Sequence, residues 1–474
     1  MPPNPDAGAK PSRVRVRMYR VGFGDCFLLS FEYPAPLHDG RSVRHVLIDF
    51  GSTSASSGTT LERIAEEIKA HSNGELDVVV VSHRHKDHLE AFGRRKLTDA
   101  LVAPGFPRLV VRSWTEDPDA RRNARQPPGG HGIAPVGDKS AAFVETLERA
   151  ERAIKRLAER VPAAELRSLA GVLHHVANDQ LKNRDAVERL ASWGEAGDQA
   201  YLHYGMPSKI ESFVPGISVR VLGPPTVEQH EDITSQRSRD MDEFWMIYRN
   251  LFESFEKVDL EEPAPTDRDA DAVDQEPTPE SESEPETEAP PVPAGFGEPG
   301  PVRWLTDSLS RQRLNSLLRI VRTLDSAMNN TSLILLIDVP GVERQRLLFP
   351  GDAQIENWEY ALKKADHFEK NLDLLREVDL YKVGHHGSRN ATPRTLFNLW
   401  TEAGTKDRPM TAMMSTKGGV HGESVATAVP RATLKAALDT RMKLHSTQSL
   451  GSKKPWLEVA ADLTAPGGFK RVED

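Results

Sequence analysis

The chain has 474 residues, of which 28% are charged and 38% hydrophobic, and a formal net charge of −9. This length suffices for one large core or two ordinary ones, and no apolar run approaches the roughly 18 residues of a membrane-spanning helix. The single cysteine excludes an intramolecular disulfide framework, and the Pro- and Ala-rich N-terminus lacks the apolar core of a signal peptide. We therefore expect a cytoplasmic protein without a membrane partner.

The acidic charge is concentrated in one stretch. Residues 261–290 hold twelve acidic residues and one arginine, a local charge of −11, which leaves +2 on the rest of the chain. The Pro-rich segment around them, residues 253–301, has too little apolar surface to fold and is predicted to be a disordered linker. An acidic tract that mimics nucleic acid, or one that recruits a protein partner, are the alternatives. Since the remainder is near neutral, an anionic substrate is not excluded.

The first predicted strands lie near the N-terminus. Residues 14–19 alternate apolar and basic side chains, which is typical of an edge or outer strand. Residues 22–25 form a predicted tight turn, and the returning strand begins at Cys26, predicted to be a buried structural thiol. The next strand, residues 46–50, ends just before a glycine.

Residues 78–88 read Val-Val-Val-Val-Ser-His-Arg-His-Lys-Asp-His. The valines predict a fully buried strand, and the helical pattern that precedes them completes a βαβ-like unit. His83 and His85 are two apart in an extended segment and point the same way, so both can bind one ion. Asp87 and His88 follow where a turning chain can aim them at a second ion. Imidazole and carboxylate suit zinc, manganese or iron, and a polar loop that is merely rich in histidine is the alternative.

The second half of the chain supplies further strands around an insertion. Residues 141–193 carry apolar side chains at helical spacing and are predicted to form a helical insertion over the core, as a lid or substrate wall. Strands are predicted at residues 217–222, 333–337 and 347–349. A last strand, residues 378–383, leads into Gly-His-His-Gly-Ser.

Four motifs, in this order along the chain, resemble the signature of the metallo-β-lactamase-fold hydrolases: Leu47-Ile48-Asp49-Phe50-Gly51, His83-x-His85-x-Asp87-His88, Leu348-Phe349-Pro350-Gly351-Asp352 and Val383-Gly384-His385-His386-Gly387-Ser388. The opening Val21-Gly22-Phe23-Gly24-Asp25-Cys26 and the His-His-Gly-Ser sequence resemble the ComEC-like branch, named for the hydrolase domain of the DNA-uptake competence protein. The motifs are specific for the fold and much less so for the substrate.

This resemblance implies a role for each motif. Asp49 is expected to support the metal-binding histidines, the alternative being a turn aspartate before glycine. Asp352 is expected to bridge two ions, because a carboxylate has two oxygens. The spacing leaves open which neighbouring histidine completes the second site; we favour His386 as the ligand and His385 as a substrate-side or supporting group. His421 resembles the branch's C-terminal loop and is a further site candidate.

The family usually has one more histidine ligand before the bridging aspartate. Three histidines are candidates, none in a convincing setting: His131, His203 and His230. The first ion is then left with His83, His85 and Asp352 as its protein ligands.

The predicted fold is α/β (α+β), an αββα sandwich of two mixed β-sheets with helices outside and the site at one edge. Residues 13–225 and 302–460 both supply ligands and are predicted to form one domain, and residues 1–12 are expected to be disordered. The expected cofactors are two divalent metal ions, zinc or alternatively manganese, with a bridging hydroxide as the nucleophile. The residues assigned to catalysis are Asp87, Asp49, His385 and His421.

The leading hypothesis for function is a phosphodiesterase, above all a nuclease, which acts on nucleic acid or a small phosphodiester. One alternative keeps the metal centre but gives it a small ester of the phosphocholine type, a lactone or an amide. The other is a non-catalytic, partner-binding protein with a structural metal centre.

Overall fold

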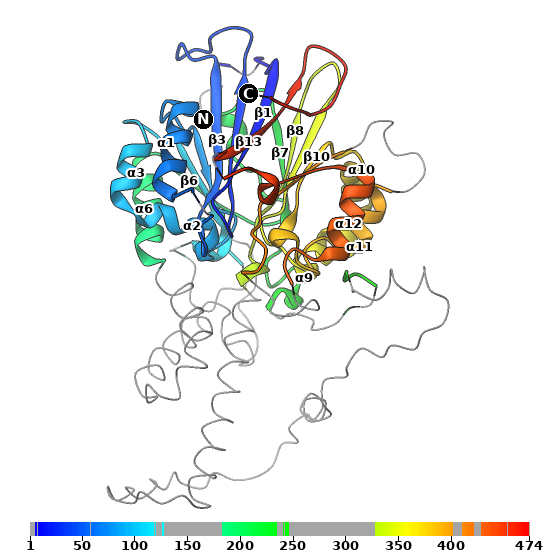
Figure 1. Cartoon of the computed structure of the whole chain (residues 1–474). Coiled ribbons are helices and arrows are strands. Elements are labelled where there is room, and N and C mark those ends of the chain that lie inside the picture. The colour runs from blue at the N-terminus through cyan, green and yellow to red at the C-terminus, as the bar shows by residue number, and fades with distance from the viewer. Residues whose placement is uncertain are drawn as a thin grey trace, which may run out of the picture. The chain divides into compact units, whose positions relative to one another are not determined.

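In a computed structural model of the chain, the residues described are 5–6, 8–56, 58–117, 119, 126–127, 183–234, 240, 242–245, 328–401, 410–420, 428–452 and 454–473. They form two mixed β-sheets and a set of helices (Figure 1). This confirms the predicted mixed α/β class with two mixed sheets.

The first sheet has eight strands in the order β14-β13-β1-β2-β3-β4-β5-β6. They are β1 (Arg13–Tyr19), β2 (Cys26–Glu32), β3 (Val43–Phe50), β4 (Val78–Val80), β5 (Leu109–Ser113), β6 (Asp198–Leu202), β13 (Trp456–Asp462) and β14 (Lys470–Arg471). Neighbours from β14 to β3 pair antiparallel, whereas those from β3 to β6 pair in parallel. Helix α1 (Leu61–Ser72) connects β3 to β4, so the predicted βαβ-like unit is confirmed.

The second sheet has six strands in the order β12-β11-β10-β9-β8-β7. They are β7 (Ser218–Gly223), β8 (Ile334–Val339), β9 (Gln345–Phe349), β10 (Leu380–Lys382), β11 (Thr411–Met414) and β12 (Lys443–Ser446). Strands β7, β8 and β9 pair antiparallel, and β9 to β12 pair in parallel. Because β7 precedes the acidic segment and β8 follows it, both halves of the chain build this sheet.

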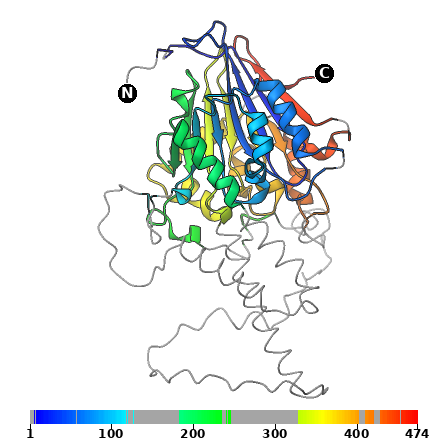
Figure 2. The same cartoon turned by 90° about the vertical axis from the view of Figure 1, so that its left-hand side faces the viewer.

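The two sheets pack face to face, and helices cover their outer faces (Figure 1). The core between the sheets joins Val16 and Ile48 of the first to Leu335 and Leu347 of the second. The first sheet is covered by α1, α3 (Arg95–Leu101) and α6 (Arg184–Ala196), which stand in front of it in Figure 2. The second sheet is covered by α9 (Ile355–Glu359), α10 (Phe368–Arg376), α11 (Arg394–Leu399) and α12 (Ala432–Arg441).

Short helices and turns complete the described part of the chain. They are α2 (Lys86–Leu89), the 3-10 turns η1 (Glu90–Gly93), η2 (Trp114–Glu116), η3 (Ile210–Ser212), η4 (Glu231–Thr234), η6 (Gly384–Gly387) and η7 (Thr447–Ser449), and the π-helical turn η5 (Tyr360–Lys364). Cys26 is a free thiol buried at the start of β2, as predicted. None of the helices in the described ranges is both long and apolar enough to cross a membrane.

Strand β1 lies inside the first sheet, between β13 and β2, so the expectation of an edge strand is wrong. Its apolar side chains, such as Val16, face the core between the sheets. Arg15 and Arg17 alternate with them, and Glu458 on β13 forms ion pairs with both. The Glu458 carboxylate on the neighbouring strand thus compensates the charges of the two arginines, which water would solvate at an exposed edge.

The expected disorder of residues 1–12 is wrong for its C-terminal part. Ala9 packs against the core between the sheets, and Pro11 is buried. The amide of Ser12 donates a hydrogen bond to the carbonyl of Glu32 at 2.7 Å. These three anchored residues next to a strand outweigh a Pro- and Ala-rich composition, and such long-range anchoring leaves no trace in the local sequence.

Two other predicted segments lie largely outside the described residues. These are the helical insertion up to residue 182 and the acidic segment 253–301. The last residues of the predicted insertion belong to α6, which packs Ala186 and Leu190 against the first sheet. Helix α6 therefore forms part of the outer layer and connects β5 to β6.

Candidate metal centre

Four of the six predicted metal ligands converge at one end of the two sheets. Asp87 and His88 lie in α2, just after β4 of the first sheet. Asp352 follows β9 and His386 follows β10, which are parallel neighbours in the second sheet. The carboxyl ends of parallel strands share an edge, so the loops that follow them come together.

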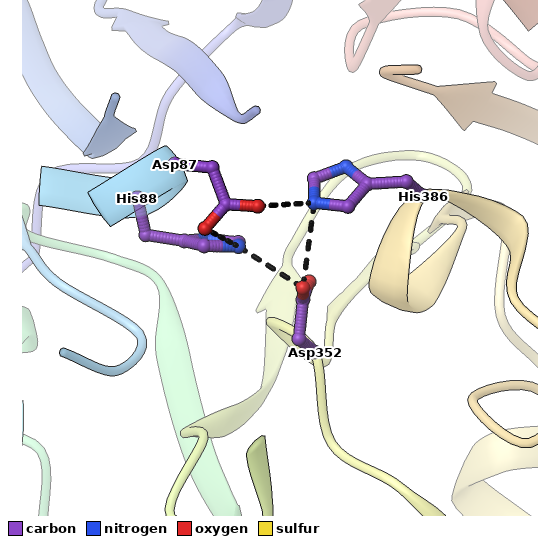
Figure 3. A group of neighbouring side chains, drawn as sticks. All are labelled: Asp87, His88, Asp352 and His386. Carbon is purple, nitrogen blue, oxygen red and sulfur yellow. Dashed lines mark hydrogen bonds and ion pairs between the residues drawn. The ribbon is translucent and has the colours of Figure 1, made fainter. Parts of the chain in front are cut away.

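Four side chains converge there: Asp87, His88, Asp352 and His386 bring ligand-type atoms to within 4.8 Å of one another (Figure 3). The Nε2 atom of His386 lies 3.0 Å from Oδ2 of Asp87 and 3.4 Å from Oδ2 of Asp352. The Nε2 atom of His88 lies 3.1 Å from the same Asp352 oxygen. All four residues are buried. Two imidazole nitrogens and two carboxylates in one place are a donor set that fits a divalent transition-metal ion.

The second ring nitrogen of each histidine has a fixed partner. His88 Nδ1 donates a hydrogen bond to Oδ2 of Asp49 at 2.9 Å. His386 Nδ1 donates to the backbone carbonyl of Ser415 at 3.0 Å. Metal-binding histidines almost always carry such a partner, because it fixes the tautomer and turns the other nitrogen toward the metal. This geometry supports the fit of the four residues to a metal ion.

Asp49 is held in turn by the loop after β4. The backbone amide and the hydroxyl of Ser82 each donate to one Asp49 oxygen, both at 2.7 Å. The aspartate therefore lies where a group that orients His88 has to lie. Its role in supporting a metal ligand remains a prediction.

Several site residues adopt an unusual backbone conformation. Asp49, His385 and His386 have φ values of 57°, 41° and 51°, in the left-handed region that side chains other than glycine rarely adopt. Gly351 has a φ of 54°, and a Cβ atom on it would lie 2.7 Å from Cβ of Ser82. Glycine thus lets the Asp352 loop approach the Ser82 loop. Such outliers gather at functional sites, where the surrounding structure holds them in place.

His83 and His85 lie beside the four-residue cluster. Nε2 of His83 and Nδ1 of His85 are 2.9 Å apart, and the ring centroids of His83 and His88 are 4.2 Å apart. Burial holds the pKa of His83 well below its ordinary value, which favours the neutral form that binds metals. In the described part of the chain, neither histidine belongs to a group of three or more residues whose ligand-type atoms all lie within 4.8 Å of one another. Their assignment to a first ion stays a prediction.

The charges in the cluster are strongly coupled. Burial would lower the pKa of His88, but Asp352 and Asp49 raise it well above its ordinary value. Burial also opposes the charge on His386, but Asp352 and Asp25 raise its pKa to about 10. Burial would raise the pKa of Asp352, yet His88 and His386 hold it well below its ordinary value. The metal-free chain thus compensates its carboxylates with two protons, which a metal ion has to displace.

Two charged residues at this site were not assigned by the sequence analysis. Lys382, on β10, forms an ion pair with Asp25 and another with Asp352 at 3.3 Å. Asp25 also lies 3.6 Å from Nδ1 of His386 and 3.7 Å from Nδ1 of His88. One available signal was a lysine inside an otherwise apolar strand. Another was the position of Asp25 in the Val21–Cys26 motif, where it was interpreted only as a turn residue.

The other predicted histidines have different positions. His385 is half-buried and lies outside the four-residue cluster. His203 is half-buried and donates from Nδ1 to the carbonyl of Tyr204 at 2.9 Å. His230 is buried and belongs to a separate group, with Asp232 and Glu359. Two candidates lie outside the described residues, His131 and His421.

No protein-family model matches the chain, and a search of curated proteins finds no match. The resemblance to the metallo-β-lactamase-fold hydrolases therefore rests on the motifs, and the function has to be inferred from the site.

Proposed function

We propose that this protein is a metal-dependent hydrolase with the metallo-β-lactamase fold and a dinuclear centre, and that it acts as a phosphodiesterase, above all as a nuclease. The observation that carries the proposal is the convergence of two carboxylates and two correctly oriented imidazoles in one buried cluster. Two face-to-face mixed sheets, with the cluster at one end of both, support the choice of fold.

The proposed ligands divide into two sets. The ligands of one ion are Asp87, His88, Asp352 and His386. The ligands of the other are His83, His85 and Asp352. Zinc suits these donors, with manganese as the alternative. When bound, the ions supply a Lewis acid for the scissile phosphoryl oxygen and lower the pKa of a coordinated water. The chain itself orients the ligands, through Asp49 and the Ser415 carbonyl.

Partly exposed cations next to the predicted ligands in the sequence are compatible with an anionic substrate. Arg84 and Lys86 alternate with the ligands in the loop after β4 and are partly exposed. Lys417 donates to the carbonyl of Ala55 at 2.7 Å. Ala55 follows Ser54, which forms a β-bridge with Phe23. The ring centroid of Phe23 is 4.4 Å from that of His386. Positive side chains that reach a metal centre would favour a phosphodiester over a neutral ester.

The test combines metal analysis with two substrates, bis-p-nitrophenyl phosphate and single-stranded DNA. We expect two divalent ions per chain and cleavage of at least one diester by the parent. Asp87→Ala and His88→Ala each remove a ligand, and we expect single-turnover cleavage to fall by about 100-fold or more, since the transition-state charge loses its stabilisation. His367→Asn, at an exposed position away from the cluster, is the control.

Three results would contradict this proposal or part of it. Cleavage of DNA by Asp87→Ala at the parent's rate would show that the cluster does not carry the reaction. If the fully metal-loaded parent cleaves no diester, the proposed substrate becomes a small ester, a lactone or an amide. One ion per chain under saturating metal would exclude the dinuclear form.

A further inference from the structure

The side chain of Lys382 is buried, with only 2% of the residue's surface exposed, and lies next to Asp352 of the candidate metal centre. Its Nζ donates to the carbonyl of Gly351 at 2.8 Å, forms an ion pair with Asp25, and lies 3.3 Å from Oδ1 of Asp352. An ammonium group has three N–H donors; two of them bond to the Gly351 carbonyl and Oδ1 of Asp352, and the charge is paired with Asp25. A buried charge is tolerated when it is paired and hydrogen-bonded in this way.

The two oxygens of Asp352 consequently have different surroundings. Oδ1 faces Lys382, whereas Oδ2 lies within 3.4 Å of Nε2 of both His88 and His386. The carbonyl of Gly351, one residue before Asp352, is bound to the same ammonium. Lys382 therefore holds both the side chain and the adjoining backbone of this ligand.

We infer that Lys382 is a positioning residue, which holds Asp352 so that only Oδ2 faces the metal ligands His88 and His386. The inference rests on the proposed metal centre and specifies how one of its ligands binds. Asp25 is the second carboxylate in this arrangement, because it forms an ion pair with the Lys382 ammonium and keeps it in place. Oδ2 is then the oxygen of Asp352 that would be available to a metal ion, since Oδ1 is held by the lysine.

Removal of Lys382 changes the metal affinity in one direction if the lysine positions Asp352, and in the other direction if it acts only through its positive charge. Removing a cation beside the site would, by charge alone, make a divalent ion bind more tightly. Without the ammonium, however, Oδ1 of Asp352 loses its donor and the carboxylate can turn to offer both oxygens to one ion. Because the freed carboxylate has to be ordered again when the ion binds, positioning predicts weaker binding with altered coordination, whereas charge alone predicts tighter binding with the coordination unchanged.

The experiment titrates Co²⁺ into the metal-free full-length protein and records the dissociation constant and the visible absorption bands, which report coordination number. We expect Lys382→Met to raise the dissociation constant about tenfold or more, as for other residues that orient metal ligands. We also expect weaker absorption, because a second carboxylate oxygen raises the coordination number. Lys382→Arg, which keeps the charge and donors, should restore part of the affinity.

A double variant guards against loss of folding. Lys382→Met leaves the buried Asp25 carboxylate without its cation, so Asp25→Asn/Lys382→Met removes both charges and should fold like the parent, with the same loss of affinity. The control is Arg346→Met, which removes another buried cation of the second sheet, paired with Asp338 at 2.8 Å. It should leave Co²⁺ binding unchanged.

The outcomes of this experiment distinguish a failure of the inference about Lys382 from a failure of the proposed metal centre. If the folded double variant binds Co²⁺ as tightly as the parent or more tightly, with the parent's spectrum, Lys382 does not position Asp352 and the metal centre still stands. If the parent binds no Co²⁺, zinc or manganese, the metal centre is wrong and the inference is wrong with it.

Discussion

At the scale of single residues, three of the four clustered ligands are held by a partner that does not itself belong to the cluster. Asp49 holds His88, the Ser415 carbonyl holds His386, and Lys382 holds Asp352. These partners are polar groups in a buried environment, where each hydrogen bond is stronger and each missing partner more costly than in water. The ligand geometry is therefore set by residues one step away from the metal.

Asp49→Asn tests this dependence on orientation. The amide keeps the size of the side chain but has a single oxygen with which to accept from Ser82 and His88. We expect the dissociation constant for Zn²⁺ to rise about 10- to 100-fold, measured by competition with a chromogenic chelator. Asp77→Asn is the control, because Asp77 is an equally buried carboxylate that accepts from the amide of His45 at 2.9 Å, away from the cluster. Equal losses of affinity in both variants would show a general effect on folding instead.

The ligand types were predictable from the sequence, whereas their supports were not. His-x-His-x-Asp-His after a buried strand places donors at a strand end, and the run of β-branched valines indicates the strand. Lys382 occupies a position in the strand pattern like any other residue, and only the packing of a second sheet brings it against Asp25 and Asp352. The carbonyl of Ser415 is a backbone group, so no side-chain pattern marks it.

At the scale of elements, the site depends on the close approach of three loops. The amide of Asp25 donates to the carbonyl of Asp87 at 2.9 Å, which joins the turn before β2 to α2. A Cβ atom on Gly51 would lie 2.3 Å from the carbonyl oxygen of Lys86. The loop after β3 can thus pass α2 only because glycine has no side chain.

Gly51→Ala should disturb the centre through packing alone. The methyl group would push α2 away from the end of β3 and displace Asp87 and His88. We expect a loss of about 1–3 kcal/mol in unfolding free energy and weaker Zn²⁺ binding, measured by chemical denaturation and by chelator competition. Gly451→Ala, where an added Cβ meets nothing within 4 Å, should change neither quantity. Parent-like metal binding by Gly51→Ala would contradict the tight approach.

Strand β3 also contains a pH-sensitive group away from the centre. Burial lowers the pKa of His45 from its ordinary value of 6.5 to about 3, and Arg41 and Arg17 add to the effect. The unfolded chain therefore binds a proton as pH falls below about 6.5, while the folded chain resists it down to about pH 3. This contribution to stability is fully present above pH 6.5 and is lost progressively between pH 6.5 and 3.

His45→Asn should make the acid limb of the stability curve shallower. An asparagine keeps a polar group near Ser30, whose hydroxyl lies 3.0 Å from Nδ1 of His45, but cannot titrate. Urea denaturation from pH 7 to pH 4, with chelator present, gives the unfolding free energy of parent and variant. The difference between them should change in favour of the variant as pH falls. His367→Asn, on the surface, should follow the parent. A constant difference across this range would show that His45 does not titrate as inferred.

At the scale of the whole molecule, both halves of the chain contribute ligands to the candidate metal centre. Asp87 and His88 come from the first sheet, Asp352 and His386 from the second. The amide of Leu333 donates to the carbonyl of Ser82 at 2.9 Å and joins the two sheets next to this cluster. A metal ion held by both sheets binds only the folded chain, so saturating Zn²⁺ should stabilise it. The resemblance to the metallo-β-lactamase-fold hydrolases led to the expectation of two sheets with helices outside, but the β1 pattern alone could not reveal that β13 returns from the far end of the chain to pair with it.

The acidic segment should be dispensable for this assembly. The chain leaves the second sheet after β7 and re-enters it at β8, and these strands are antiparallel neighbours, so a short connection can join them. Trp245, before the segment, is buried and donates from its ring nitrogen to the carbonyl of Thr392 at 2.7 Å, which anchors the point of departure. The segment is predicted to lack a core of its own, and shortening such a loop changes its closure entropy only slightly.

We therefore expect deletion of residues 261–300 behind a short Gly/Ser bridge to leave soluble yield, melting temperature and metal content within error of the parent. Activity on bis-p-nitrophenyl phosphate, a substrate too small to reach beyond the centre, should also be retained. Cleavage of DNA should rise if the acidic tract screens the site, because a local charge of −11 repels a polyanion, and that difference should shrink as salt is added. The control replaces the same residues with a neutral Gly/Ser segment of equal length, which separates charge from loop length. Insoluble or metal-free protein from the deletion, with the neutral replacement normal, would show that the connection between β7 and β8 needs that length. Loss of solubility in both would show that residues 261–300 contribute to the fold.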